Sequence, residues 1–134
     1  MAENTKTFVV DSSVLMAVLM PDENKSLKVK KLLKIIVSKN KIIAPNLLIY
    51  EIGNGLKSAA LSKRITFSQA GFLLNTFNQL SINLVSIDIN SVFKTAIEHK
   101  MTFYDASYFY LAKLNKCKLL TLDHHLEEIV ATER

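Results

Sequence analysis

Apolar residues follow two alternating patterns along the 134-residue chain. Short segments of four or five mostly apolar residues, typical of buried strands, alternate with longer segments in which apolar residues recur every third or fourth position, as on one face of a helix. Strands are predicted at 7–10, 41–44, 84–87 and 118–122. Helices are predicted at 14–20, around 29–36, at 46–63, from Ser68 as N-cap to about Leu80, and at 89–99, 101–116 and 126–130.

This alternation predicts the fold class. Strands separated by helical segments of about ten residues or more form βαβ units, in which a parallel sheet is covered by helices on both faces. We therefore expect an α/β fold with three layers, α/β/α, around a central parallel sheet of four or five strands. A chain of 134 residues can bury one core without disulfides, and no repeat or linker interrupts the pattern, so residues 1–134 are expected to form a single domain.

Several residues mark where these elements should begin, end or pack closely. Residues 21–24 (PDEN) break the chain after the first helix, and Asp88 is expected to cap the helix at 89–99. Gly53 and Gly55 each cost a helix about 1 kcal/mol relative to alanine. Tight helix packing or access to a site is therefore expected to retain both glycines.

Four acidic residues occupy positions that one edge of such a sheet could bring together. Asp11 and Asp123 each follow a predicted strand, and Glu51 lies near the start of the helix after the second strand. Asp105 opens the helix before the last strand. Ligands of open parallel sheets bind beyond the carboxyl ends of the strands, so the four acids are expected to converge there.

Each acid also has a local explanation. Thr102 and Asp105 match a capping box at a helix start, and Asp11 and Asp123 could each cap the helix that follows. Glu51 could pair with a lysine or arginine. Four independent caps or pairs are not expected to fall on one edge of a sheet, so the sequence favours a shared acidic site.

Clustered carboxylates need a cation to offset their repulsion. Oxygen ligands select Mg²⁺ or Mn²⁺, which can bind phosphate oxygens and lower the pKa of a water molecule, the chemistry of phosphodiester cleavage. Asp11, Asp105 and Asp123 are the expected direct or water-mediated ligands, and Glu51 is expected to bind the metal or position the attacking water. The expected supporting residues are Ser12, Asn54 and Thr121.

Composition adds limits and one option. The net charge of +5 and the pI near 9.3 permit a polyanionic partner such as RNA. The predicted helix at 29–36 has a basic face of four lysines that is either solvated or follows a phosphate backbone. Despite 49% hydrophobic residues and a mean hydropathy of +0.20, no run is long enough to span a membrane and no signal peptide is recognisable, so a cytoplasmic location is expected.

The remaining residues with chemical potential have simpler interpretations. Cys117 has no partner cysteine in the chain and is expected to be a buried or half-buried thiol. The histidines lack the spacing of a zinc helix and are expected on the surface or behind the site. The aromatic side chains of the helix at 101–116 are expected in the core or in a dimer contact; they are Tyr104, Tyr108, Phe109 and Tyr110.

The motifs around the four acids resemble those of PIN-domain ribonucleases, most closely the VapC-type toxins. They are Val9–Ser13, Glu51–Asn54, Thr102–Ala106 and Leu120–Asp123. The resemblance implies a PIN-like fold and a metal-dependent endoribonuclease that leaves a 5′-phosphate product. It also implies a homodimer, a small antitoxin protein docked over the acidic groove, Asp11, Glu51, Asp105 and Asp123 as the acidic centre, and Ser12 as a supporting hydroxyl.

The chain departs from this pattern in two places. Few residues follow Asp123, so the final strand of the family is expected to be shortened or missing, and His124 and His125 replace a more usual basic or polar residue. Two other functions remain open: a catalytically silent PIN-like module that binds RNA or protein, and a phospho-accepting receiver domain. The receiver domain would need paired acids near the first strand and a lysine after the last, where Asp123 lies instead.

Overall fold

The computed structural model describes residues 5–21 and 24–132, which contain four strands and seven helices. The strands are β1 (Thr7–Val10), β2 (Lys41–Pro45), β3 (Ile82–Val85) and β4 (Lys118–Leu120). The helices are α1 (Ser12–Leu19), α2 (Leu27–Val37), α3 (Leu47–Leu61), α4 (Phe67–Gln79), α5 (Ile89–His99), α6 (Phe103–Leu114) and α7 (His124–Thr132).

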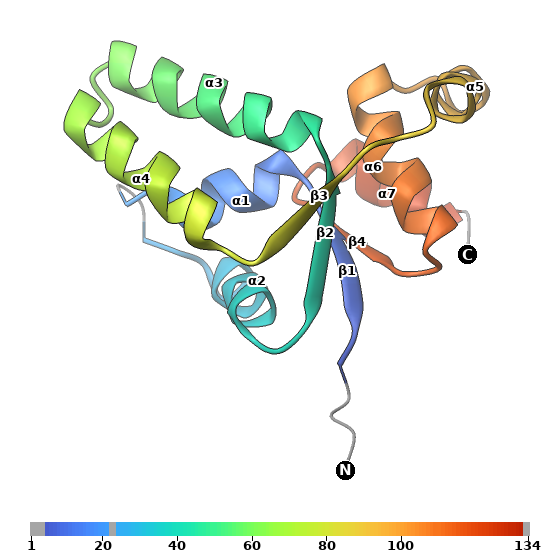
Figure 1. Ribbon diagram of the computed structural model, residues 1–134, viewed down its shortest axis with the longest axis horizontal. Coiled ribbons are helices and arrows are strands. Elements are labelled where there is room, and N and C mark those ends of the chain that lie inside the picture. Colours follow the sequence, from blue (N-terminus) through green and yellow to red (C-terminus); the bar gives the residue numbers. More distant parts are fainter. Residues whose placement is uncertain (1–4, 22–23, 133–134) are drawn as a thin grey trace.

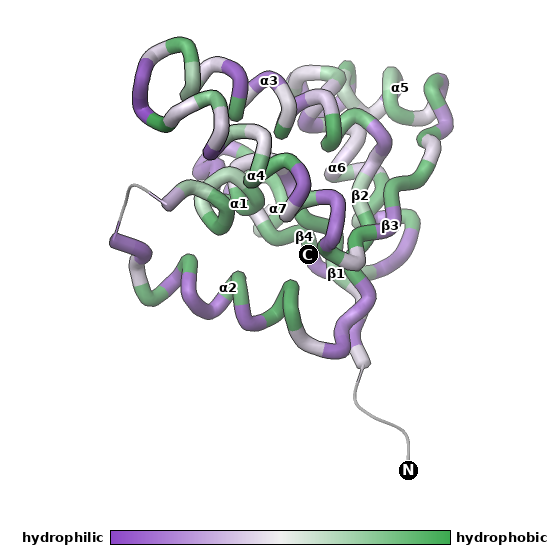
Figure 2. Tube along the Cα trace, turned by 60° about the vertical axis from the view of Figure 1, so that its left-hand side comes forward, coloured by the Kyte–Doolittle hydropathy of each residue, from purple (hydrophilic) through white to green (hydrophobic). Residues whose placement is uncertain are grey.

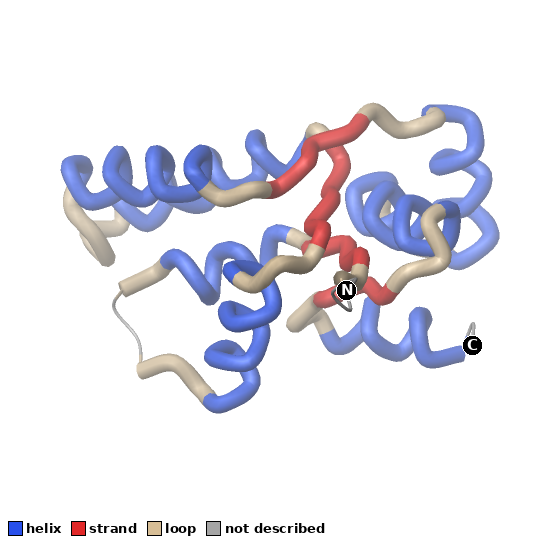
Figure 3. Tube along the Cα trace, turned by 60° about the horizontal axis from the view of Figure 1, so that its bottom comes forward, coloured by secondary structure: helices blue, strands red, loops and turns tan. Residues whose placement is uncertain are grey.

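The strands form one parallel sheet in the order β3-β2-β1-β4. Figure 1 shows helices α1 to α4 on one side of the sheet and α5 and α6 on the other, and Figure 3 shows the same division from below. A parallel sheet needs this double cover because its crossover helices lie on the faces. The predicted three-layer α/β fold is therefore confirmed, with a sheet of four strands.

The strand order places the carboxyl ends of β1 and β4 side by side. From β1 to β3 each new strand is added on the same side, and β4 then pairs with the opposite side of β1, where Val10 is in register with Leu120. Such a reversal opens a crevice at the carboxyl ends of the two strands and is the usual ligand site of open α/β sheets. Asp11 and Asp123 follow these two strands.

The hydrophobic core is continuous across both faces of the sheet. Val9, Val10 and Ile42 are at most 1% exposed, and the strands appear mainly as apolar segments in Figure 2. On the face of the sheet opposite helices α1 to α4, α6 packs on three strands and buries Tyr108 and Phe109. The prediction that these two aromatic side chains lie in the core is thus confirmed, whereas Tyr104 is 61% exposed.

Several predicted boundaries shift. The N-cap of α4 is Thr66 and not Ser68, because Thr66 and Gln69 form a reciprocal capping box. Strand β3 covers 82–85 instead of 84–87, since its register follows β2 from Ile42 to Pro45. Strand β4 ends at Leu120 because Thr121 and the residues after it turn into the site. The predicted break at 21–24 lies partly outside the described residues.

Close packing explains one of the two glycines of α3. A Cβ atom on Gly55 would lie 3.0 Å from the side chain of Met16 on α1, whereas one on Gly53 would meet nothing within 4 Å. The close approach of α1 and α3 therefore favours a glycine at 55, whereas nothing nearby favours one at 53. No helix within the described ranges has the length and apolar character needed to cross a bilayer.

Candidate functional site

Asp11 lies at the centre of the carboxyl edge of the sheet. It is 5% exposed, and its backbone N–H donates to the carbonyl of Leu120 at 3.2 Å. Its Oδ1 accepts hydrogen bonds from the Ser13 hydroxyl at 2.6 Å and the Val14 N–H at 3.2 Å, and its Oδ2 accepts one from Thr121. Burial raises the pKa of Asp11, and the bonds from Ser13 and Thr121 oppose that shift. Asp11 therefore caps α1 and also presents a fixed carboxylate to the edge.

Ser13 and Thr121 join the ends of β1 and β4. The Ser13 hydroxyl accepts the N–H of Leu122 at 2.9 Å, and the Thr121 hydroxyl accepts the N–H of Asp123 at 3.0 Å. Asp123 in turn accepts the N–H of Leu126 at 3.1 Å, so it caps α7 while remaining exposed. These bonds hold Asp123 in a set position relative to Asp11.

Glu51 reaches the site from α3, in the layer opposite α6. The Tyr108 hydroxyl of α6 donates to its Oε1 at 2.5 Å. Burial raises the pKa of Glu51, the bond from Tyr108 opposes this, and the charges of Asp11 and Asp105 raise it further. The pKa of Tyr108 lies well above its usual range because of burial and the bond to Glu51. The Tyr108–Glu51 contact therefore links the two helical layers at the site.

Asp105 lies in the first turn of α6. Its N–H donates to the Thr102 hydroxyl at 3.0 Å, so Thr102 is the cap that the sequence predicted. Burial raises the pKa of Asp105, the charges of Asp123 and Asp11 raise it further, and Thr102 and His125 oppose the shift. Its carboxylate thus lies within the electrostatic field of the other acids, as well as beside its cap.

The structure therefore brings the four predicted acids to one edge of the sheet. Within residues 5–21 and 24–132, however, no group of three or more Asp, Glu, His or Cys side chains is arranged to hold a metal ion directly. Mg²⁺ commonly binds proteins through one or two carboxylates and keeps several waters. The four carboxylates supply only oxygen donors, which fits an ion of this kind that is bound partly through water. The catalytic roles of the four acids stay predictions.

Sequence reasoning missed two members of this edge. Ser13, the neighbour of the predicted Ser12, donates to Asp11, and the supporting role of Ser12 stays a prediction. Tyr108 was predicted only as a core or dimer residue, yet it binds Glu51. Its position three residues after Asp105 on α6 was the available signal, since such residues share a helix face. Asn54 is exposed on α3, and its supporting role stays a prediction.

Asp11, Glu51, Asp105 and Asp123 lie at the carboxyl ends of the strands, which we call the acidic edge. Together with the fold, this edge defines a class of α/β domain with a polar site where the strand order reverses. The family model of the PIN domain matches residues 8–131. The chain belongs to the PIN domain family. The resemblance seen in the four acidic motifs is thereby confirmed.

Relatives and one solved structure agree with this assignment. The chain is 33% identical over 93 residues to exonuclease VapC9 of Pyrobaculum aerophilum, covering 69% of this chain and 70% of that protein. It is 33% identical over 119 residues to ribonuclease VapC1 of Mycobacterium tuberculosis, covering 88% and 86%. The crystal structure of PAE2754 from Pyrobaculum aerophilum superposes with a TM-score of 0.72 at 28% identity, covering 93% and 85%.

Proposed function

We propose that this chain is a metal-dependent endoribonuclease that hydrolyses RNA phosphodiester bonds as the toxin of a VapBC-type toxin–antitoxin pair, acting as a single PIN domain in the cytoplasm. The observation that carries the proposal is the convergence of Asp11, Glu51, Asp105 and Asp123 at the reversal of the sheet. Burial raises the pKa of the first three, and the charges of neighbouring acids raise the pKa of Glu51 and Asp105 further. The names of VapC1 and VapC9 as nucleases support it.

Asp11, Asp105 and Asp123 would hold Mg²⁺ or Mn²⁺ directly or through water. When bound, the ion would neutralise charge on a phosphate and lower the pKa of a water molecule. Ser13 and Thr121 orient both oxygens of Asp11, which keeps this carboxylate in one position during turnover.

Glu51 would position the attacking water. The hydrogen bond from Tyr108 occupies Oε1 of its carboxylate, which leaves Oε2 to orient the water. Its raised pKa also makes this carboxylate a better proton acceptor than an ordinary glutamate. Water oxygen would attack phosphorus in line, the P–O3′ bond would break, and the products would carry a 5′-phosphate and a 3′-hydroxyl.

The test compares cleavage of RNA by the wild type with Mg²⁺, with Mn²⁺ and with EDTA, and by Asp105→Asn. The matched control is Glu98→Gln, which changes an exposed acid on α5. We expect cleavage only with metal, loss in Asp105→Asn and wild-type rates in the control. Wild-type cleavage by Asp105→Asn, or cleavage in EDTA, would refute the assigned mechanism; RNA binding without any cleavage would favour the silent binding module.

The mode of attack needs a separate substrate, because one relative is named an exonuclease and another a ribonuclease. A covalently closed circular RNA has no end for an exonuclease. We expect the chain to linearise it. Resistance of the circle alongside degradation of its linear form would replace endonuclease with exonuclease action.

We also propose a homodimer and an antitoxin partner. The α5 residues Ile89, Phe93 and Ile97 recur every four positions and are 58–66% exposed, which suits burial against a second copy. Phe93→Glu should convert a dimer into a monomer in light scattering. A monomeric wild type would contradict the dimer. The antitoxin is expected to cover the acidic edge, so adding it should protect RNA from cleavage.

A further inference from the structure

The amino ends of the strands, opposite the acids, carry a second charged surface. Two stretches of the chain, 24–50 and 106–122, contain seven and three lysines and no acidic residue. The fold brings part of each stretch to the same edge of the sheet, because β2 and β4 flank β1. The lysines at this edge, which we call the basic edge, are Lys6, Lys39, Lys41, Lys116 and Lys118.

The sheet register places the lysines of the basic edge at neighbouring strand starts, with Lys41 and Lys118 on opposite faces of the sheet. Lys41 begins β2 and pairs with Thr7, and Lys118 begins β4 and pairs with Phe8. Lys6 directly precedes the same strand, β1, and its carbonyl accepts the N–H of Lys41 at 2.8 Å. The backbones of these three lysines therefore lie at the starts of adjacent strands, which are about 5 Å apart in a sheet. All five lysines of the basic edge are exposed.

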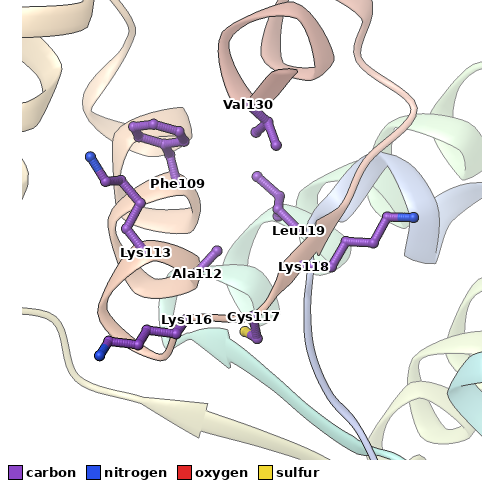
Figure 4. A pocket seen from close by; sticks show the side chains of 8 residues that line it. All are labelled: Phe109, Ala112, Lys113, Lys116, Cys117, Lys118, Leu119 and Val130. Carbon is purple, nitrogen blue, oxygen red and sulfur yellow. The ribbon is translucent and has the colours of Figure 1, made fainter. Parts of the chain in front are cut away.

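Two lysines of the basic edge, Lys116 and Lys118, do not converge on one point. Figure 4 shows the region around Lys113, Lys116 and Lys118, whose amines point in different directions around a small apolar pocket formed by α6, β4 and α7. A single small anion needs donors that face one another. Dispersed, solvated cations instead suit a polymer that presents a phosphate at regular intervals.

We propose that the basic edge is a second RNA-binding surface that holds the phosphate backbone of the substrate away from the acids that cleave it. The proposal rests on the proposed ribonuclease function. Strand β1 has four residues and therefore separates the two edges by roughly 13 Å at about 3.3 Å per residue. An RNA bound at both edges must extend several nucleotides beyond the scissile phosphate, so long RNA should gain affinity that very short RNA lacks.

The test uses two triple variants of the full chain that lower the net charge equally. The edge variant is Lys6→Gln, Lys41→Gln and Lys118→Gln, and the control variant is Lys57→Gln, Lys63→Gln and Lys94→Gln in exposed positions of α3, the turn after it and α5. The backbone bond between Lys6 and Lys41 survives these side-chain changes. Circular dichroism and thermal melts check that both variants fold.

Binding is measured by fluorescence anisotropy in EDTA with a single-stranded RNA of about 30 nucleotides, long enough to reach both edges, over a range of salt concentrations. Loss of three phosphate contacts should flatten the slope of log Kd against log salt by about 2 and weaken binding at least about tenfold near 0.1 M salt. The control variant should retain most of the wild-type slope. Equal losses in both variants would overturn the proposal.

Cleavage of a dinucleotide, assayed with Mg²⁺, separates this proposal from the function on which it rests. Its single phosphate cannot lie at the acids and at the basic edge at the same time. The edge variant should cleave it at the wild-type rate. If no variant cleaves any RNA, the ribonuclease function fails, yet the binding contrast still decides the basic edge. Edge-dependent binding of polyglutamate, without edge-dependent binding of RNA, would assign the surface to an acidic protein and refute the RNA proposal.

Discussion

At the carboxyl ends of the strands, Asp11 is 5% exposed and both its oxygens accept hydrogen bonds. At the amino ends of the same strands, Lys41 and Lys118 are exposed to solvent. The first end places charge in a set geometry and protects it from water, whereas the second spreads charge of opposite sign over a surface. The difference indicates short-range chemistry at one edge and long-range attraction of a polyanion at the other.

The largest difference between the two edges is expected when one charge is removed from each and cleavage is measured. Asp11→Asn should lower the rate of cleavage of a dinucleotide at least about a hundredfold, because changes behind a metal ligand already cost ten- to hundredfold. Lys41→Gln should leave that rate unchanged. Initial rates measured at saturating RNA check this prediction, and a similar loss in both variants would mean that the edges do not differ in role.

The stability of the folded protein should depend on pH through the carboxyl groups of the acidic edge, several of which contribute together. Burial raises the pKa of Asp11 and Asp105 above 3.8 and that of Glu51 above 4.5. The folded state then binds more protons than the unfolded state between the ordinary and the raised values, so the free energy of unfolding falls as pH rises through the raised pKa values. Thermal melts in EDTA should show this decrease.

Millimolar Mg²⁺ or Mn²⁺ should offset that decrease, because an ion that binds only the folded protein stabilises it. The melting temperature near neutral pH should therefore rise with metal concentration. An unchanged melting temperature would count against a metal site at the acidic edge. Substitutions at the basic edge should leave the metal response unaltered.

A smaller effect is expected from Ser13, which belongs to the acidic edge alone. Ser13→Ala removes the bond to Asp11 and leaves the N–H of Leu122 without its acceptor, so we expect a loss of about 1–2 kcal/mol in the free energy of unfolding. Denaturant unfolding measures it. Ser12→Ala is the neighbouring control. An equal loss in its free energy of unfolding would mean that the Ser13 hydroxyl contributes no more to stability than its neighbour.

The smallest effects separate the capping role from the role in the acidic site at the start of α6. Thr102→Ala should cost about 1 kcal/mol, since Thr102 accepts the N–H of Asp105. Asp105→Asn should cost nothing in the metal-free protein, because it relieves repulsion from Asp123 and Asp11. Denaturant unfolding in EDTA compares the two. A loss in Asp105→Asn as large as that in Thr102→Ala would make Asp105 a structural residue.

Local rules predicted much of this molecule. The alternation of strands and helices, the cap at Thr102 and the position of Asp11 after β1 follow from residues close together in sequence. The same rules failed at Ser68, because Gln69 selects Thr66 as its partner in the capping box. They also could not distinguish Gly53 from Gly55, which differ only in their distance from Met16 on another helix.

The sequence by itself determined the α/β class, the family motifs and the four acids at element ends, since periodicity and capping act over a few residues. Only the tertiary structure decided which side chains meet. Thr121 binds Asp11 across 110 positions because β4 returns to pair with β1, and Tyr108 reaches Glu51 because α6 and α3 cover opposite faces of one sheet. Strand order and register set these contacts, and they likewise bring distant lysines to one basic edge.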